Sequence, residues 1–398
     1  MKKIGIVSSF SDSCGNAYFS KILVDSISNL GYEVVPLELD LKLLQSVTPS
    51  VRKIANECID KLCSRIKELD GVNIQLEPGL YGSTPMDIRS RFSRLISANS
   101  SVSVTLHSPR LIADVTQQRQ AIKALTRLNF KVALKKYLTY KASNLHIQMN
   151  NDLIKLAIKR GVKLIVHTMR AKEQISSIFG YSNVDVHPLK IISDNFVQDE
   201  NCLRLIKKNL ELDKADVVIG MFGFINEYKG HTMAINTLIH LPDNFKLLIF
   251  GRQHPQTIMH NCPVDGYLND LQELIVEKKL QNRVYFMGEY STEDFINLAA
   301  SVDAVWLPYV ENGQDGSGIA SICLDVSPRV LCSSSFAFDE LFKLEKYNNV
   351  LRFDIGNVLE LATKTKMALN SVDRFAAHSR KYTCESQAKL YVRCHDSI

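Results

Sequence analysis

The segment that decides the fold is Val217-Val-Ile-Gly-Met-Phe-Gly-Phe-Ile-Asn-Glu-Tyr-Lys-Gly230. Its apolar run ends in Gly-x-x-Gly, a short polar loop follows, and Lys229-Gly230 precede a helical pattern that starts at His231. This order predicts a buried strand, a glycine turn, and a lysine near the start of a helix. Glycines let the backbone approach a ligand closely, and the N–H groups at a helix start favour anionic groups. The segment therefore predicts a place where a phosphate binds.

The length and composition of the chain indicate a soluble protein of two domains. The chain has 398 residues, of which 45% are hydrophobic and 23% charged, and one ordinary core does not extend over such a length. The apolar stretch at the N-terminus turns polar after about four residues, so we expect a first strand there rather than a signal peptide. No window approaches the roughly 20 apolar residues of a membrane span. Nine cysteines show no zinc or redox spacing, which favours reduced thiols in a cytosol.

Strands and helices alternate along the first half of the chain, which predicts a parallel sheet with helices on both faces. Helical spacing predicts helices over Ala17–Leu30 and Val51–Glu68. The expected strands are Lys3–Ser8, Tyr32–Leu37, Gly71–Leu76, Ser101–Leu106, Leu145–Gln148, Lys163–His167 and Asp185–His187.

The alternation restarts after a polar segment at Ser193–Lys214, which we interpret as the connection between domains. The expected strands are Val217–Met221, Lys246–Phe250, Val284–Met287, Ala304–Leu307, Arg329–Cys332 and Val350–Arg352. Helices are expected at Thr232–Ile239, Tyr267–Lys278, Thr292–Ala300, Ala320–Leu324, Phe338–Leu344, Asn357–Leu369 and Asp373–Val392. The predicted fold is α/β, with two doubly wound domains at 1–192 and 193–375. Residues 376–398 are expected to form a C-terminal helix that could pack back on the first domain.

Several motifs occur in one order along the chain. They include Gly31-Tyr-Glu-Val-Val35, Gln75-Leu-Glu-Pro-Gly79, a strand that ends in His107, Ala171-Lys-Glu173, Gly223 to Gly230, Phe286-Met-Gly288 and Leu307-Pro308. Together they resemble GT-B glycosyltransferases, most closely glycosyltransferase family 4. The resemblance implies two Rossmann-like domains that face a central cleft. It also implies a hexosyltransferase that moves a sugar from a nucleotide-sugar to an acceptor with retention at the anomeric carbon. No metal ion and no further cofactor are expected, so positive side chains and backbone amides must hold the leaving diphosphate.

The resemblance assigns the diphosphate to the second domain. Lys229 would be the main phosphate contact, although an exposed lysine at a helix start is the simpler alternative. Gly223 and Gly230 would permit the turn, and the segment at Gly288 would lie near the base.

The sequence departs from the family at two places. Phe224 stands where the family has a second cationic contact, and Arg252 could replace it, although a solvated arginine is equally compatible with the sequence. The family's pair of glutamates is absent, because Gln314 and Ile322 occupy those places. The run Gly316-Ser317-Gly318 before a predicted helix could instead bind the diphosphate through backbone N–H groups. Glu311 or Asp315 could contact the sugar hydroxyls.

The candidate residues of the first domain follow its strands. His107 would donate a hydrogen bond to the reacting sugar, and a structural histidine is the alternative. Gly15 and Asn16 open the first helix and resemble the loop that approaches the donor phosphate and the acceptor. Glu77 could line the acceptor side, or could be an ordinary turn carboxylate.

A basic stripe is independent of these motifs. Eight Lys or Arg and one acid, Asp114, lie between Arg110 and Lys141. Five of the cations recur every four residues on one expected helix beside apolar positions: Arg119, Lys123, Arg127, Lys131 and Lys135. A basic amphipathic helix can lie on an anionic membrane surface, which would suit a lipid-linked acceptor. A solvated helix face is the alternative, and aromatic residues are too few to favour nucleic acid.

These observations favour a cytoplasmic, peripheral membrane glycosyltransferase of polysaccharide or glycolipid biosynthesis. Two rival hypotheses keep the fold. The missing cation and glutamates would also suit a non-catalytic scaffold that binds a partner glycosyltransferase or a saccharide. A nucleotide-sugar epimerase would use the same fold without an acceptor.

Overall fold

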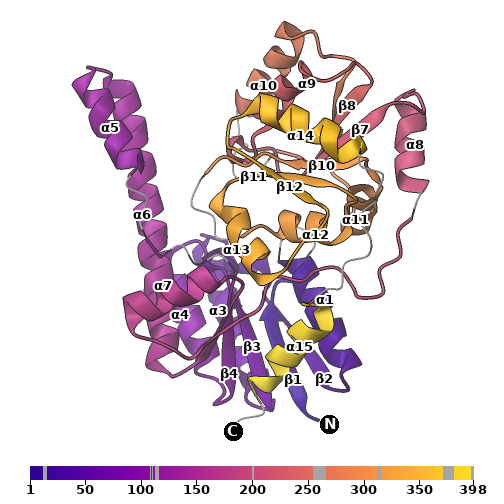
Figure 1. Ribbon diagram of the computed structural model, residues 1–398. Coiled ribbons are helices and arrows are strands. Elements are labelled where there is room, and N and C mark those ends of the chain that lie inside the picture. The colour runs from indigo at the N-terminus through magenta and orange to yellow at the C-terminus, as the bar shows by residue number, and fades with distance from the viewer. Residues whose placement is uncertain are drawn as a thin grey trace. The chain divides into compact units, whose positions relative to one another are not determined.

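The computed structural model describes residues 1–11, 16–107, 109, 111–112, 116–199, 201–253, 266–311, 316–370 and 381–395. The chain forms two compact units, Met1–Pro188 with Tyr382–Ile398, and Leu189–Lys381 (Figure 1). The first crossing between them therefore lies before the predicted boundary at residue 192. The second crossing, after Lys381, assigns the C-terminal helix to the first unit.

The first unit contains a six-stranded parallel sheet in the order β2-β1-β3-β4-β5-β6. The strands are β1 (Lys3–Ser8), β2 (Glu33–Glu38), β3 (Gly71–Leu76), β4 (Val102–Leu106), β5 (Lys163–Val166) and β6 (Val184–Val186). Strand β3 is buried along its whole length, as expected for the centre of a sheet covered on both faces. The predicted parallel α/β architecture is confirmed for this unit.

Helices connect and cover these strands. They are α1 (Ala17–Asn29), α2 (Leu41–Leu44), α3 (Pro49–Ile66), α4 (Pro85–Ile96), α5 (Thr116–Thr126), α6 (Phe130–Lys159), α7 (Met169–Phe179) and α15 (Cys384–Arg393), with a 3-10 turn, η1, at Pro78–Leu80. Helix α15 packs beside α1. Its capping box at Thr383 starts the helix, in agreement with the second half of the predicted helix Asp373–Val392. Residues 371–380 lie outside the described part of the chain.

The strand predicted at Leu145–Gln148 is wrong, because these residues lie inside the 30-residue helix α6. Four residues are too short to separate a strand from a helix by periodicity. The buried positions in and after this run, Ile147, Ile154 and Ala157, have helical spacing over a longer window.

The single helix predicted for the basic stripe is also wrong. The chain turns between α5 and α6 at Leu128, whose φ is +57°, and the two helices pack against each other. Asn129 starts α6, because its side chain accepts a hydrogen bond from the backbone N–H of Val132 at 3.3 Å. Asparagine at this position was the signal for the helix start.

The second unit contains another six-stranded parallel sheet, in the order β12-β11-β10-β7-β8-β9. The strands are β7 (Val217–Phe222), β8 (Phe245–Phe250), β9 (Val284–Gly288), β10 (Ala304–Leu307), β11 (Val330–Ser333) and β12 (Val350–Phe353). The helices are α8 (Asn201–Asn209), α9 (His231–Leu238), α10 (Gly266–Glu277), α11 (Thr292–Ser301), α12 (Gly318–Val326), α13 (Phe336–Leu344) and α14 (Val358–Asn370), with a 3-10 turn, η2, at Glu227–Lys229. All six predicted strands of this unit are present.

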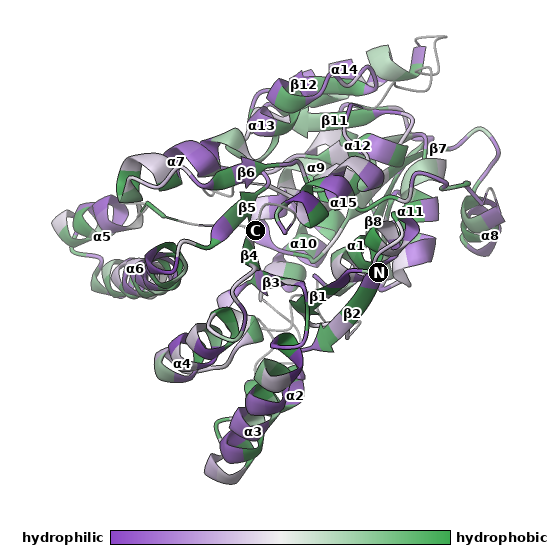
Figure 2. Cartoon of the chain, turned by 90° about the horizontal axis from the view of Figure 1, so that it is seen from below, coloured by the Kyte–Doolittle hydropathy of each residue, from purple (hydrophilic) through white to green (hydrophobic). Residues whose placement is uncertain are grey.

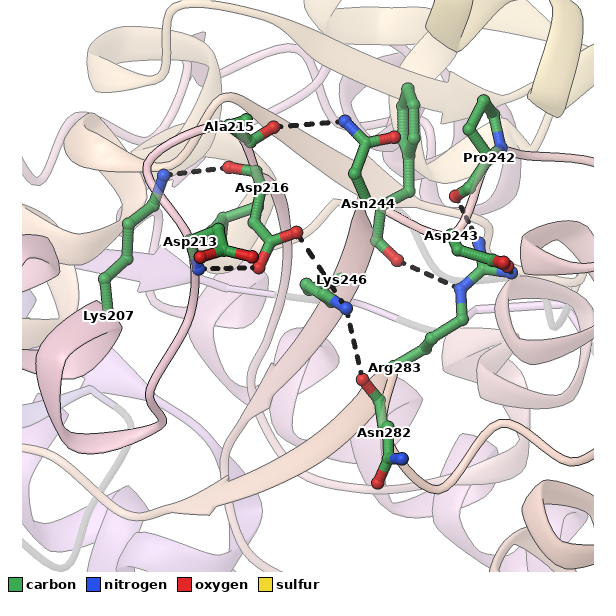
Figure 3. A network of polar contacts seen from close by, with 12 residues as sticks. Lys207, Asp213, Ala215, Asp216, Pro242, Asp243, Asn244, Lys246, Asn282 and Arg283 are labelled. Atoms are coloured by element: carbon green, nitrogen blue, oxygen red, sulfur yellow. Dashed lines mark hydrogen bonds and ion pairs between the residues drawn. The ribbon is translucent and has the colours of Figure 1, made fainter.

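A polar network fixes the amino-terminal edge of the second sheet (Figure 3). Arg283, just before β9, is buried and donates hydrogen bonds to the carbonyl groups of Leu241 at 3.1 Å, Pro242 at 2.8 Å and Phe245 at 3.2 Å. One side chain thereby donates to three backbone acceptors, in the turn before β8 and at the first residue of β8. These hydrogen bonds stabilise the amino-terminal edge, which lies opposite the carboxyl ends of the strands.

A buried ion cluster holds both crossing segments to the second unit. Lys190, 3% exposed, donates to Asp325 and to Glu345, each at 2.9 Å. The other carboxylate oxygen of Glu345 accepts from the backbone N–H of Lys381 at 2.9 Å. Since each ion has a partner, the cluster avoids the large cost of an isolated buried charge.

Candidate functional site

The sheet of the second unit has its reversal point between β7 and β10. From β7 the chain continues to β8 and β9 on one side, and β10 begins the series on the other. In open α/β sheets the loops at such a point separate and leave a crevice at the carboxyl ends of the strands. The segment after β7 and the segment after β10 therefore form the candidate site.

Two glycines let the chain make the required turns after β7. A side chain at Gly223, whose φ is +100°, would lie 3.1 Å from Ile319. A side chain at Gly230, whose φ is +76°, would lie 1.9 Å from the carbonyl oxygen of Pro308. Gly230 is thus required for the close approach of η2 to the end of β10.

Lys229 is the last residue of η2 and is only 4% exposed. Its ammonium group donates a hydrogen bond to the hydroxyl of Tyr309 and lies 4.2 Å from the centre of that ring and 5.3 Å from the ring of Tyr228. Within the described residues no carboxylate forms an ion pair with Lys229. Burial lowers the pKa of Lys229 to about 7. A buried cation without a counter-ion is costly, and an anionic ligand would remove that cost.

The hydroxyl of Ser317 continues the chain of contacts from Lys229. Tyr309 accepts from the lysine and lies 3.1 Å from Ser317, so its own hydrogen can be donated to the serine oxygen. Ser317 also caps α12, because it accepts from the backbone N–H of Ala320 at 3.2 Å. The serine oxygen is then an acceptor twice, and its own hydrogen is left to donate to a ligand. The predicted Gly316-Ser317-Gly318 run is therefore brought together with Lys229.

Arg252 and Gly288 lie at the carboxyl edge of the neighbouring strands. Arg252 is 42% exposed, forms an ion pair with Glu289 at 3.1 Å, and lies over the ring of Phe224 at 5.9 Å. Gly288, with φ of +77°, accepts a hydrogen bond from the backbone N–H of Gly251 at 2.8 Å. Among the described residues the side-chain partners of Arg252 are Glu289 and the ring of Phe224, and its role as a second phosphate contact stays a prediction.

Glu311 already has structural partners. Its carboxylate accepts from the backbone N–H of Phe336 at 2.8 Å and from the hydroxyl of Ser335 at 3.2 Å, at the start of α13. A contact with sugar hydroxyls would compete with this capping role. Gln314 and Asp315 lie outside the described residues.

The candidate residues of the first unit lie at the carboxyl ends of β1, β3 and β4. His107 follows β4, and its Nε2 donates to Oε1 of Gln75 at 2.6 Å. Glu77 follows β3 and lines a small pocket together with Leu76, Pro78, Leu106, Pro109, Asn150 and Ile154. Asn16 precedes α1 without a side-chain capping bond, and Gly15 lies outside the described residues.

Sequence reasoning missed Tyr309, Gln75 and the pairing of His107 with His167. The two imidazole rings have centroids 5.2 Å apart, and the ring of Phe19 on α1 contacts both edge-on. Tyr309 directly follows Leu307-Pro308, so its place after a predicted strand was available as a signal. Gln75 opens the motif Gln75-Leu-Glu-Pro-Gly79, but the sequence does not reveal that its side chain contacts His107.

Comparisons with known proteins identify the fold. No protein-family model and no curated protein matches the chain. HepE of Anabaena, solved in complex with UDP and glucose, is similar in structure over 100% of both chains, with a TM-score of 0.64 at 14% identity. A glycosyltransferase from Rickettsia africae ESF-5 matches 99% of this chain and 97% of its own, with a TM-score of 0.63 at 13% identity. The chain has the GT-B fold.

A third solved structure with this fold is WaaG, described as a glycosyltransferase involved in lipopolysaccharide biosynthesis. It matches 97% of this chain and 99% of its own, with a TM-score of 0.53 at 14% identity. At such identities the GT-B fold is shared, whereas the site residues must be argued from this chain alone.

Proposed function

We propose that this GT-B protein is a retaining glycosyltransferase that takes a sugar from a nucleotide-sugar and passes it to a saccharide or lipid-linked acceptor. One observation carries the proposal: Lys229 is a buried cation without a carboxylate partner among the described residues, at the reversal point of its sheet. A diphosphate supplies the negative charge that this position lacks.

The groups around Lys229 suit a leaving diphosphate. When the bond between the sugar and the diphosphate breaks, negative charge develops on the phosphate oxygens. Lys229 supplies a positive charge, and Ser317 and the N-terminal turn of α12 supply hydrogen-bond donors. We propose that these groups stabilise the diphosphate without a metal ion. Retention at the anomeric carbon is proposed from the sequence resemblance.

The identity of the donor is proposed from the solved relatives. HepE was solved with UDP and with UDP-glucose, so UDP-sugars are the first donors to test. The role of WaaG in lipopolysaccharide biosynthesis supports a proposal of surface polysaccharide or glycolipid assembly for this chain.

The test is a thermal-shift screen against UDP-, GDP-, ADP- and dTDP-sugars, followed by a turnover assay with the donor that binds. A ligand at one hundred times its Kd raises the free energy of unfolding by about 2.7 kcal/mol. Failure of the whole panel to bind or to be hydrolysed would rule out the proposal. Binding without turnover, together with a co-purified partner, would favour a scaffold, and a change of the sugar without any acceptor would favour an epimerase.

We also propose that the α5–α6 hairpin binds an anionic membrane surface at the cytoplasmic face. Residues 116–151 carry seven Lys or Arg and no Asp or Glu. The same hairpin exposes many large apolar side chains, and Figure 2 shows hydrophobic and hydrophilic residues side by side on it. They are Ile122, Leu125, Leu128, Phe130, Val132, Leu134, Tyr137, Leu138 and Leu145.

Cations and exposed apolar side chains together match the chemistry of an anionic lipid surface. The cations attract acidic headgroups by about 1 kcal/mol each near the surface, and the apolar side chains enter the boundary of the acyl chains. Within the described residues no helix is long and apolar enough to cross a membrane.

A further inference from the structure

A network of buried polar side chains in the first unit leads to His107. Its members lie on β3, on β4, on α15 and just after α15, and each is at most 5% exposed apart from His107 itself. They are Asn73, Gln75, Ser103, Thr105, Tyr391 and His395. Buried polar groups of this kind are costly unless each is satisfied, so their arrangement is fixed by their partners.

The partners fix the orientation of the Gln75 amide. Nε2 of Gln75 donates to Oδ1 of Asn73, at 2.5 Å. Nδ2 of Asn73 in turn donates to the hydroxyls of Ser103 at 2.9 Å and Thr105 at 3.1 Å. Oε1 of Gln75 therefore points to His107 and can only accept a hydrogen bond.

This orientation selects one tautomer of His107. Nε2 must carry the hydrogen, because it lies 2.6 Å from a carbonyl oxygen. Burial and the neighbouring His167 hold the pKa of His107 well below its ordinary value of 6.5, so the ring is neutral at physiological pH. His167 is the titratable group that contacts it, and Phe19 and Gln75 are uncharged. Nδ1 of His107 is then a hydrogen-bond acceptor.

His167 presents a second acceptor beside the first. Its Nδ1 donates to the carbonyl oxygen of His187 at 3.0 Å. Burial lowers the pKa of His167 to about 4, so Nε2 carries no hydrogen. That Nε2 is buried and has no hydrogen-bond partner in the described part of the protein. An unsatisfied buried acceptor is costly, and a ligand that donates a hydrogen bond to it would remove that cost.

The C-terminal helix α15 completes the network. The hydroxyls of Tyr391 and Thr105 form a hydrogen bond of 2.9 Å. After the helix, the ring of His395 lies 2.9 Å from the hydroxyl of Ser101 and 3.3 Å from that of Ser103. Side chains from the end of the chain thereby hold the strand residues that orient Gln75.

We infer that His107 and His167 form a pair of neutral hydrogen-bond acceptors for the hydroxyl groups of a sugar, and that Gln75 and Tyr391 are positioning residues which fix the tautomer of His107. This inference rests on the proposed function, and it reverses the donor role that the family resemblance gives to His107. The ligand class follows from the chemistry, since an alcohol supplies the hydrogen that both rings lack. An anion has no hydrogen to offer, and the described residues add no third ligand that would make a metal site.

The first test reads the tautomers directly by 15N NMR of histidine in the full-length protein at pH 7. We expect the ring hydrogen on Nε2 of His107 and on Nδ1 of His167, with both rings neutral. A hydrogen on Nδ1 of His107, or a charged ring, would overturn the inference without reference to any activity.

The second test changes the partner of His107 by Gln75→Glu. A carboxylate beside Nε2 raises the pKa of His107 and turns Nδ1 into a donor. We expect the Kd for UDP-glucose to rise roughly three- to tenfold, the effect of one hydrogen bond, with the Kd for UDP unchanged. Gln148→Glu on the exposed face of α6 is the matched control. Equal effects on both ligands, or none on UDP-glucose, would contradict the inference.

Tyr391→Phe tests the network with an isosteric change. We expect a smaller share of the Nε2–H tautomer of His107 and a roughly three- to tenfold loss of kcat/KM, again with an unchanged Kd for UDP. Tyr285→Phe, which loses a hydrogen bond to the carbonyl of Asn282 in the other unit, is the control. An altered Tm with an unaltered tautomer would make Tyr391 merely structural and refute its positioning role. A wild-type protein that binds no UDP counts against the proposed function, and the tautomer measurement still decides the inference.

Discussion

Lys229 and Tyr309 form a hydrogen-bonded pair at the carboxyl edge of the second sheet. The ammonium group donates to the phenol and lies 4.2 Å from the centre of its ring. Burial of the phenol raises the pKa of Tyr309 well above 10, so the phenol stays neutral and does not balance the charge. The lysine is thus held in place by a neutral partner, and no described carboxylate balances the charge of its protonated form.

Replacing Lys229 with methionine should stabilise the ligand-free protein and abolish nucleotide binding. Below pH 7 the lysine is charged in both folded and unfolded states, so the full cost of burying the charge is present. Above about pH 7 the folded protein loses this proton first, and the cost falls as the pH rises toward the ordinary pKa of 10.5. We expect a gain on the order of 2–4 kcal/mol at pH 6.

Urea unfolding at pH 6 and pH 9 checks this expectation. The wild type should gain stability between the two values, whereas Lys229→Met should lose that dependence. Lys343→Met, at an exposed lysine paired with Glu340, is the control and should change little. A Lys229→Met protein that is less stable than the wild type would show that the lysine is a structural residue.

Binding of a nucleoside diphosphate should be accompanied by proton uptake. An anion beside Lys229 raises the pKa of the lysine above its value of about 7 in the free protein. Near pH 7.5 the fraction of protonated lysine should therefore increase on binding by several tenths of a proton. Calorimetry of UDP binding in buffers of different ionisation enthalpy measures the number of protons taken up. If no proton is taken up, the ligand does not bind beside Lys229.

Tyr309→Phe and Ser317→Ala should show coupled losses. Each change interrupts the chain of hydroxyls that starts at Lys229, so the second change should cost less once the first is made. We expect each single change to lower kcat/KM roughly tenfold, and the double mutant to lose less than the product of the two. Full additivity in this double-mutant cycle would mean that the two hydroxyls act independently.

Replacing three cations of the α5–α6 hairpin with glutamate should release the protein from anionic vesicles. The triple change Arg119→Glu, Lys123→Glu and Lys131→Glu removes three attractive charges and adds three repulsive ones. Flotation with vesicles of phosphatidylglycerol and phosphatidylcholine measures the bound fraction, which we expect to fall at least tenfold. Turnover of a soluble acceptor should be unaffected.

The apolar part of this surface is tested separately. Leu125→Ser and Leu134→Ser should also weaken vesicle binding, whereas Val276→Ser on the exposed face of α10 should not. Equal binding to purely zwitterionic vesicles would contradict the role given to charge. Self-association of the wild type that the serine changes abolish would instead assign the surface to a second copy of the chain.

Arg283→Met should lower the free energy of unfolding without affecting the candidate site around Lys229. It removes the side-chain donor to the carbonyl groups of Leu241 and Phe245, whose hydrogen bonds to Arg283 are buried, and this costs about 1–3 kcal/mol for each group that is left unsatisfied. Chemical denaturation measures the loss, and the Kd for UDP at a temperature where the variant is folded should be that of the wild type. A changed Kd for UDP would contradict this prediction, because it would show that the two edges of the sheet are energetically coupled.

Local patterns predicted most of the strands, because each buried parallel strand is a short apolar run between turn residues. The run at Leu145–Gln148 failed for the same reason, since four apolar and polar residues fit either period. The glycine and lysine of 223–230 were found because glycine leaves a visible signal. The contacts of Tyr309, Gln75 and Tyr391 could not be predicted, because their partners are 80, 32 and 286 residues away in sequence. Only the fold brings such groups together.

The position of Tyr391 and His395 has a consequence for how the protein is made. The hydrogen bonds of Ser101 with His395 and of Thr105 with Tyr391 cannot form until these late residues have left the ribosome. Domains usually complete their folding in the order of synthesis. Here the second unit, which ends at Lys381, has all of its residues available first. The unit that begins the chain is therefore the one whose buried polar network stays incomplete until helix α15 has been synthesised.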